Sequence, residues 1–164
     1  ASAYYAKAVA WAVENGITNG MTETTFAPDA TCTRGQSVTF LYRALKGTAS
    51  GSANFTDVKS DAFYADAINW AVANNVTNGT SNTTFSPNAD CTRAEIVTFL
   101  YRANGSPAAS GASFSDVAAD EYYANAVAWA VRSGITTGTG NGKFTPNAPC
   151  TRGQIVTFLY RSSK

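Results

Sequence analysis

The sequence contains no histidine and few charged residues of either sign. Because histidine is the commonest general base near neutral pH, its absence leaves most acid–base mechanisms without their usual catalytic group. Charged residues make up 14% of the chain and the formal net charge is +1, so the field of the whole molecule does not attract a polyanion such as nucleic acid. Phosphate-binding loops and dinucleotide-binding fingerprints are missing as well. These absences argue against nucleic acid as a partner and give catalysis little support.

Long apolar runs are absent too. No stretch approaches the roughly 18 to 20 apolar residues that a membrane-spanning helix needs, so we predict no membrane insertion. The first residues do not resemble a signal peptide, and we expect any export signal to lie outside this sequence. The remaining composition is 45% hydrophobic and rich in Thr, Ser, Asn, Gly and Ala, which supports a core and is typical of secreted bacterial surface proteins.

The chain instead contains three copies of one unit that repeats every 59 residues. The copies align without insertion or deletion, and they are marked by four recurring residues: Trp11, Trp70 and Trp129; Cys32, Cys91 and Cys150; Arg34, Arg93 and Arg152; Phe40, Phe99 and Phe158. We divide the chain into repeats at 1–47, 54–104 and 113–164, joined by linkers at 48–53 and 105–112. The first repeat lacks the Phe-x-Asp-Val segment that opens the other two, because that position would fall before residue 1.

Each repeat is predicted to begin with an amphipathic helix. In the first copy, apolar residues recur with helical spacing from Tyr5 to Val13, which predicts a helix over about residues 3–15 and at the equivalent positions of the other copies. The predicted N-caps are Ser2, Asp61 and Asp120. The predicted left-handed residues at the helix ends are Gly16, Asn75 and Gly134.

A second helix is predicted after a loop of roughly 17 residues that contains a Phe-x-Pro turn. It begins with a Thr followed three residues later by Gln or Glu, the spacing of a capping box: Thr33 and Gln36, Thr92 and Glu95, Thr151 and Gln154. Two short helices cannot bury their own apolar faces. The fold class is therefore predicted to be mainly α, with three helix-loop-helix repeats that share one core about a pseudo-threefold axis.

The arginines that begin the second helices, Arg34, Arg93 and Arg152, need an explanation. A cation in the first turn faces the positive end of the helix dipole, which costs a few tenths to about 1 kcal/mol if exposed. One explanation is a salt bridge, for instance to Asp57 or Asp116. Another is a bound anion that the guanidinium holds together with free N–H groups at the helix N-terminus. Both can hold at once. A second recurring set, Arg43, Arg102 and Arg161, is explained by the helix dipole, which favours cations at a C-terminus.

Two further recurring residues leave alternatives open. Trp11, Trp70 and Trp129 offer ring area for stacking on sugars, but packing in the core or in a groove wall explains them at least as well. The odd number of cysteines, at equivalent positions of equivalent units, does not suggest an intramolecular disulfide framework. We expect Cys32, Cys91 and Cys150 to be small buried hydrophobic residues, because no histidine or second thiol in each copy supports a metal site.

The order of these motifs resembles the S-layer homology (SLH) domain family, in which three tandem copies form the usual anchoring unit. The resemblance rests on Phe-x-Asp-Val, a Trp-Ala helix ending in Gly-Ile-Thr-x-Gly, Phe-x-Pro, and Thr-Arg-Ala-Glu at the second helix. It implies that the second helices form a central three-helix bundle and that the outer helices and loops form three prongs. Grooves between the prongs would bind secondary cell-wall polysaccharide, often through a pyruvate ketal.

The resemblance also implies roles for individual residues. Arg34, Arg93 and Arg152 would neutralise the acidic ligand, and Asp57 and Asp116 would be groove or motif-supporting acids. Two departures are visible: copies one and three read Thr-Arg-Gly-Gln, and cysteine replaces the usual isoleucine before the motif. Because only copy two keeps the acidic form and copy one lacks its Phe-x-Asp-Val segment, we expect unequal sites.

The sequence therefore predicts a non-catalytic anchoring module at the bacterial cell wall that belongs to a longer exported protein with further domains. Its partner would be an anionic cell-wall polysaccharide, bound without cofactor or metal by the motif arginines, the two aspartates and the three tryptophans. A structural or protein-interaction module is the alternative, and it predicts concentration-dependent oligomers without glycan retention. A glycan hydrolase would instead release product from the same polysaccharide.

Overall fold

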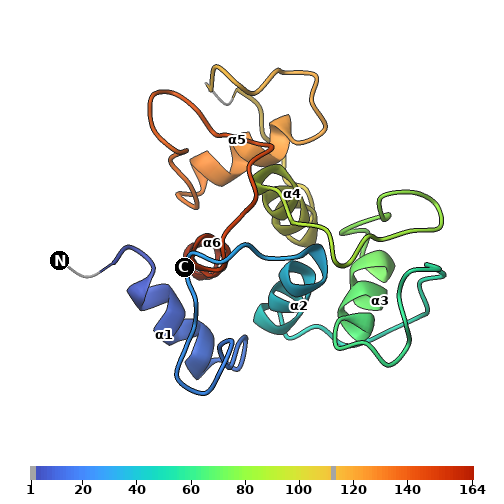
Figure 1. Cartoon of the computed structure of the whole chain (residues 1–164). Coiled ribbons are helices and arrows are strands. Elements are labelled where there is room, and N and C mark those ends of the chain that lie inside the picture. The colour runs from blue at the N-terminus through green and yellow to red at the C-terminus, as the bar shows by residue number, and fades with distance from the viewer. Residues whose placement is uncertain (1–2, 112–113) are drawn as a thin grey trace.

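The computed structural model describes residues 3–111 and 114–164, which form six helices (Figure 1). Three of them lie at the centre: α2 (Arg34–Ala44), α4 (Arg93–Ala103) and α6 (Arg152–Ser162). The other three lie outside: α1 (Ala6–Glu14), α3 (Ala65–Ala73) and α5 (Ala124–Arg132). The mainly α, pseudo-threefold arrangement predicted from the repeats is confirmed. No helix in the described ranges is long and apolar enough to cross a membrane.

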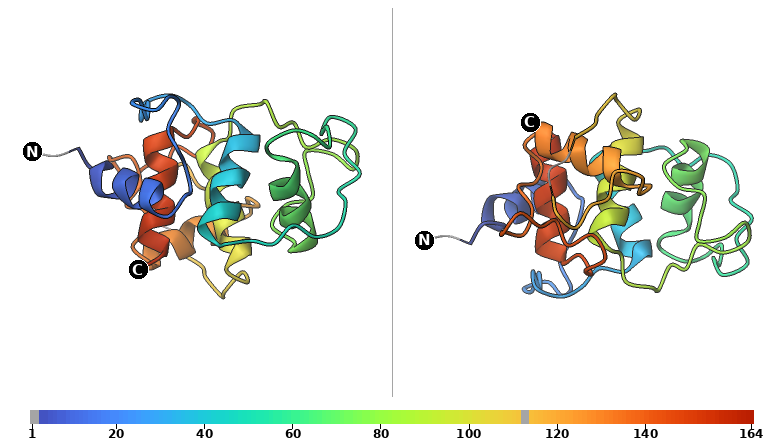
Figure 2. Two further views of the ribbon diagram at one scale, coloured as in Figure 1. Left: turned by 90° about the horizontal axis from the view of Figure 1, so that it is seen from below. Right: turned by 90° about the horizontal axis from the view of Figure 1, so that it is seen from above.

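Each outer helix packs on the inner helix of the preceding repeat rather than on that of its own. Helix α3 packs on α2, α5 packs on α4, and α1 closes the circle by packing on α6 (Figures 1 and 2). The first and last helices of the chain are therefore neighbours. The three inner helices also contact one another, so all three repeats contribute to a single core.

The cysteines lie two residues before the inner helices begin, and a closed ring of backbone hydrogen bonds joins them. The N–H of Cys32 donates to the carbonyl of Cys150 at 3.0 Å, that of Cys91 to Cys32 at 2.8 Å, and that of Cys150 to Cys91 at 2.8 Å. All three side chains are fully buried, which confirms the prediction that they are small core residues, and the thiols are free. Burial raises the pKa of Cys32 to about 11 and that of Cys91 to about 12, and it raises the pKa of Cys150 as well.

The predicted capping boxes are confirmed at all three inner helices. At α2, the Thr33 Oγ1 accepts the N–H of Gln36 at 3.2 Å, and the Gln36 Oε1 accepts the N–H of Thr33 at 3.1 Å. The predicted helix ends at Gly16, Asn75 and Gly134 are confirmed too, because their φ angles are 67°, 58° and 70°.

The predicted beginnings of the outer helices are wrong by three residues. The helices begin at Ala6, Ala65 and Ala124, after a tyrosine whose side chain makes no capping bond. In the second repeat, the N–H of Ala62 donates to Lys59 and the N–H of Ala65 donates to Ala62, so tight turns precede the helix. Asp61 and Asp120 lie in this turn region and are not N-caps, while Ser2 lies outside the described residues.

The aspartates of the Phe-x-Asp-Val segments hold the Phe-x-Pro turns. The Asp57 carboxylate accepts the N–H groups of Phe85 at 2.9 Å and Ser86 at 2.8 Å, and Asp116 does the same for Phe144 and Thr145 at 2.9 Å each. Burial opposes ionisation of Asp116, but these backbone N–H groups outweigh it and lower the pKa of the carboxyl below its ordinary value of 3.8. Each aspartate thus fixes the backbone of a phenylalanine.

We predict that Asp116→Ala lowers the midpoint of thermal unfolding near pH 7, because two backbone donors lose their acceptor. A capping loss of about 1 kcal/mol corresponds to about 2 to 4 °C in a chain of this size. Since the folded pKa is depressed, the stabilisation is present above pH 3.8 and is lost as the pH falls below it. Calorimetry over this pH range checks the prediction. Asp120→Ala, which removes an exposed carboxylate close by, is the control, and equal effects of the two substitutions at pH 7 would contradict it.

We also predict that the three thiols of the folded chain are nearly inert toward a disulfide reagent at about pH 8. For Cys32 the raised pKa alone lowers the thiolate fraction by about 100-fold, and burial restricts access further. Denaturant should release three reactive thiols at once. Rapid modification of one thiol before unfolding would show that the ring opens locally.

Candidate ligand-binding grooves

The amide groups that begin the inner helices are not free. At α2, the N–H of Arg34 donates to the carbonyl of Ala89 at 2.8 Å, and the N–H of Gly35 donates to that of Pro87 at 2.9 Å. The same pair of bonds links α4 to the third repeat and α6 to the first. The prediction of an anion held by free N–H groups at the helix N-terminus is therefore wrong, because carbonyls of the next repeat occupy those groups.

The motif arginines also reach into the next repeat. Arg34 is 3% exposed; its Nε donates to the carbonyl of Phe85 at 2.9 Å, and its guanidinium carbon lies 4.7 Å from the centre of the Phe85 ring and 5.5 Å from that of Phe99. Arg93 and Arg152 repeat this arrangement on the third and first repeats. A carbonyl and two aromatic faces thus offset the unfavourable position of a cation at a helix N-terminus.

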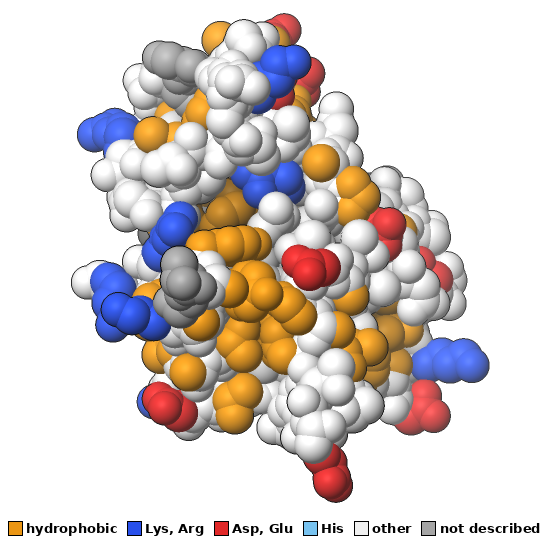
Figure 3. Space-filling view, turned by 60° about the vertical axis from the view of Figure 1, so that its left-hand side comes forward, with side chains coloured by type: hydrophobic (Ala, Val, Ile, Leu, Met, Phe, Trp, Pro, Cys, Tyr) orange, Lys and Arg blue, Asp and Glu red, His pale blue; other side chains and the backbone are white. Residues whose placement is uncertain are grey.

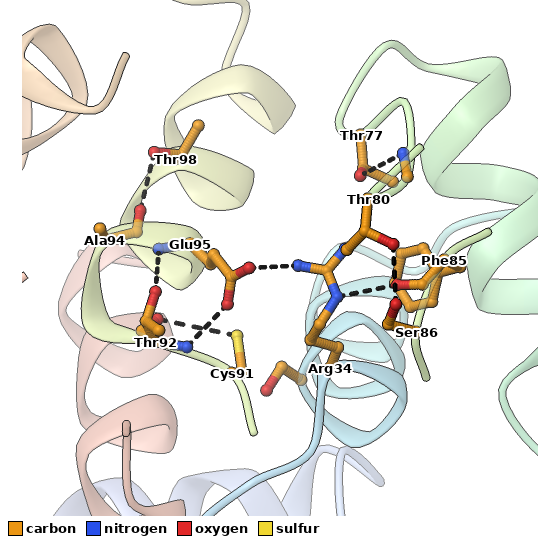
Figure 4. A network of polar contacts seen from close by, with 12 residues as sticks. Arg34, Thr77, Thr80, Phe85, Ser86, Cys91, Thr92, Ala94, Glu95 and Thr98 are labelled. Atoms are coloured by element: carbon orange, nitrogen blue, oxygen red, sulfur yellow. Dashed lines mark hydrogen bonds and ion pairs between the residues drawn. The ribbon is translucent and has the colours of Figure 1, made fainter. Parts of the chain in front are cut away.

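The predicted salt bridges to Asp57 and Asp116 do not form, because those carboxylates bind the backbone of the Phe-x-Pro turns. Within residues 3–111 and 114–164, the single ion pair joins the Arg34 Nη1 to the Glu95 Oε1 at 2.5 Å (Figure 4). The other oxygen of Glu95 accepts the N–H of Thr92 in the capping box at 2.8 Å. One carboxylate therefore completes a helix start and neutralises an arginine of the neighbouring repeat.

The other two repeats carry a glutamine at the position of Glu95. Gln154 lines the same cavity as Arg93, and Gln36 is the equivalent residue of the first repeat. The Nη2 of Arg152 has a long bond of 3.5 Å to the Thr18 hydroxyl, while the Nη2 of Arg93 is buried without a hydrogen-bond partner. Burial lowers the pKa of both guanidinium groups, which nevertheless stay charged at neutral pH.

Two cavities adjoin these arginines, and each is lined by all three repeats. The cavity beside Arg93 has a volume of about 410 Å³ and the one beside Arg34 about 370 Å³. The Arg34 cavity takes its arginine from the first repeat, residues 77–80 and the face of α4 from the second, and Tyr122 from the third; the α4 residues are Glu95, Thr98, Phe99 and Arg102. We call it the Arg34 groove.

The Arg93 groove is built in the same way, one repeat further along. It consists of Arg93, residues 136–139, Gln154, Thr157, Phe158, Arg161 and Tyr4. Figure 3 shows the side of the molecule that carries α1 and α5, where basic and hydrophobic side chains gather in a hollow between two lobes. Both grooves run along the face of an inner helix and do not end at its N-terminus.

Sequence reasoning missed two residue types that line these grooves. Arg102 and Arg161 were explained by the helix dipole alone, yet each lines a groove; their Nη1 atoms donate to the carbonyls of Val76 at 3.4 Å and Ile135 at 3.0 Å. Tyr4 and Tyr122 are each 60% exposed, and the equivalent residue of the second repeat is Phe63. An exposed aromatic residue that recurs in every copy was the signal that could have revealed this position.

The tryptophans and aspartates lie apart from the two cavities. Trp11, Trp70 and Trp129 pack against Tyr160, Tyr42 and Tyr101 between an outer and an inner helix, with ring centres 5.6 to 5.7 Å apart. Asp57 and Asp116 support the turns whose phenylalanine carbonyls bind Arg34 and Arg93. Of the residues predicted to bind ligand, only Arg34 and Arg93 line these cavities.

Comparison with known proteins gives a consistent family. The model of the S-layer homology domain matches three segments of the chain, residues 1–36, 54–97 and 113–156. The chain is 35% identical over 166 aligned positions to the surface-layer 125 kDa protein of Lysinibacillus sphaericus, covering 98% of this chain and 14% of that protein. It is 34% identical over 114 positions to a cell surface protein of Thermoanaerobacter kivui, covering 66% of this chain and 15% of that protein.

Enzymes contain the same kind of segment. The amylopullulanase of Thermoanaerobacterium thermosulfurigenes is 30% identical over 152 positions, which cover 88% of this chain but only 8% of the enzyme. The chain thus spans a small part of each of these relatives. The family places it at the bacterial cell surface, in a module that anchors longer proteins to the cell wall. Because one family pattern matches three successive segments over most of its length, the chain belongs to the S-layer homology domain family.

Proposed function

We propose that this chain anchors a longer protein by binding an anionic cell-wall polysaccharide in the grooves between its repeats. The ligand group is a carboxylate on a terminal sugar, such as a pyruvate ketal, and the motif arginines Arg34, Arg93 and Arg152 are the residues that receive it. The observation that carries the proposal is that a buried arginine and a second arginine line the same groove beside an exposed tyrosine.

The residues of the Arg93 groove suit such a ligand. Guanidinium groups form strong, directional hydrogen bonds with carboxylates, and Arg93 retains an unused buried donor. The ring of Tyr4 offers an apolar face for a sugar ring at the rim. Threonines at 136, 137, 139 and 157 also line the cavity. The hydroxyls of Thr139 and Thr157 already donate to the carbonyls of Lys143 and Gly153, so toward a sugar hydroxyl they act as acceptors. Among the residues that the structure describes, no Asp or Glu lines this cavity, so they supply no carboxylate pair for glycoside cleavage there.

In this proposal the other predicted residues act indirectly. Asp57 and Asp116 are positioning residues, because they fix the turns whose carbonyls hold the arginines. The three tryptophans take the packing role that their contacts with tyrosines support. Repeats at 1–47, 54–104 and 113–164 with linkers at 48–53 and 105–112 remain our proposed division of the chain.

We predict that the double variant Arg102→Gln, Arg161→Gln loses affinity for purified cell walls by roughly tenfold or more, because each groove loses a donor to the bound anion. Both residues lie in the last turns of their helices, and because each also donates to a backbone carbonyl, the thermal midpoint of the variant is measured beside its affinity. Co-sedimentation with cell walls measures the effect. Arg132→Gln, which removes an exposed arginine that lines neither groove, is the matched control.

Equal retention of this control and the double variant would remove the groove arginines from the mechanism. A native chain that forms concentration-dependent oligomers and is not retained on cell walls would instead indicate a protein-interaction module.

Removal of the ligand's charge should have the same effect as removal of the arginines. Cell walls treated with mild acid to hydrolyse pyruvate ketals should retain much less of the native chain, and rising salt should weaken its retention on untreated walls. Sedimentation with matched treated and untreated walls measures this. Undiminished retention after complete depyruvylation would exclude the ketal as the group that is recognised.

A further inference from the structure

We infer that Glu95 weakens the binding of anionic ligands in the Arg34 groove, so that the Arg93 groove is the principal carboxylate-binding site of this chain. The inference rests on the proposed function and names which groove performs it. It is carried by the contrast between an arginine that a carboxylate of the protein already occupies and an arginine that is buried with a donor unused.

The two grooves form a matched pair within one molecule. Eight of the ten lining positions carry the same residue type in both, from the motif arginine to the tyrosine at the rim. The exchanges are Asn78 for Thr137, which leaves the charge unchanged, and Glu95 for Gln154, which does not. Two arginines and one carboxylate give the Arg34 groove a formal charge of +1, while two arginines give the Arg93 groove +2.

Glu95 is held where a ligand carboxylate would have to bind. Its Oε1 contacts the Arg34 Nη1 at 2.5 Å, and its Oε2 is fixed by the N–H of Thr92 at 2.8 Å (Figure 4). An incoming anion would have to displace this carboxylate from the capping box or bind beside it against like-charge repulsion. Both alternatives weaken binding at Arg34.

The Arg93 groove has the opposite property. Arg93 is 3% exposed, and its Nη2 is buried without a hydrogen-bond partner, a condition that is unfavourable for a donor. A ligand oxygen in the cavity that Arg93 lines would relieve it once the guanidinium turns toward the cavity. The Oε1 of Gln154 is occupied by the N–H of Thr151 at 3.2 Å, and its amide nitrogen adds donors to the same cavity. At the position where Glu95 places a carboxylate in the Arg34 groove, Gln154 therefore leaves only hydrogen-bond donors in the Arg93 groove.

The Arg152 boundary also lacks the carboxylate, but it differs from the Arg93 groove at other positions. Its Nη2 is 3.5 Å from the Thr18 hydroxyl, and Gln36 is the residue equivalent to Glu95. At the positions of Tyr4 and Thr139, however, the corresponding residues of this repeat boundary are Phe63 and Met21. The charge is retained there, but two hydroxyl groups are lost, so we rank this boundary below the Arg93 groove for a sugar ligand.

The decisive experiment exchanges the two side chains. Gln154→Glu and Glu95→Gln both preserve the capping box, because Glu closes it in α4 and Gln closes it in α2 and α6. The probe is a methyl hexopyranoside that carries a 4,6-linked pyruvate ketal. Its binding to the full chain is followed by NMR titration of the arginine Nε–Hε signals, which report each groove separately.

In the native chain we expect the Arg93 signal to titrate roughly tenfold or more tightly than the Arg34 signal. Gln154→Glu should weaken binding at Arg93 by a similar factor, and Glu95→Gln should strengthen binding at Arg34. The double exchange keeps the net charge constant and should reverse the preference. Glu14→Gln, which removes an exposed carboxylate from the end of α1, should leave both sites unchanged.

The outcomes separate this inference from the proposed function. Native titration of Arg34 and Arg93 with equal affinity, or an exchange that alters neither site, would overturn the role of Glu95 while the grooves remain binding sites. A native chain in which no arginine responds to the probe would overturn the proposed function, and this inference with it.

Discussion

The contact on which the structure depends is the one between the beginning of each inner helix and the loop of the next repeat. At α2, the N–H groups of Arg34 and Gly35 and the guanidinium Nε all donate to carbonyls of residues 85–89 in the second repeat. A helix N-terminus has several backbone donors without intrahelical partners. Here a different repeat supplies the acceptors. No repeat can complete its own inner helix, so the three repeats must fold together.

The same contact makes the grooves. Because the motif arginine crosses to the next repeat, it enters a cavity whose loop and helix face belong to that repeat. The remaining repeat contributes the tyrosine ring at the rim. Circular closure by α1 on α6 is therefore needed for the Arg93 groove, whose Tyr4 comes from the beginning of the chain. Ligand binding and the closed arrangement of the repeats should consequently stabilise each other.

Local sequence patterns predicted the local features well and the contacts between repeats poorly. Thr33 and Gln36 specify a helix start within four residues, and Gly16 marks a helix end, so both were readable. Asp61 has the right chemistry for an N-cap, but the turns before Ala65 displace the helix beyond its reach. The Arg34–Glu95 pair joins residues 61 apart, and no periodicity indicates such a partner. Asp57 was read as an ion-pair partner because its role in holding the Phe85 turn depends on a loop conformation that composition does not specify.

The motif at the start of the inner helices differs between repeats at two positions. One difference affects the packing between repeats, and the other affects the charge in the groove. A Cβ at Gly35 would lie 2.7 Å from the Tyr64 ring, which is too close for a larger residue. Glycine therefore occupies this position although it costs about 1 kcal/mol of helix propensity relative to alanine. The equivalent residue of the second repeat, Ala94, is buried in the core. The difference between Gly35 and Ala94 therefore concerns how closely neighbouring repeats pack. The exchange of Gln154 for Glu95 leaves the capping box intact and changes only the charge that faces the groove. Since backbone contacts hold the pseudo-threefold frame, a single carboxylate can make two otherwise matched grooves electrostatically different without disturbing the fold.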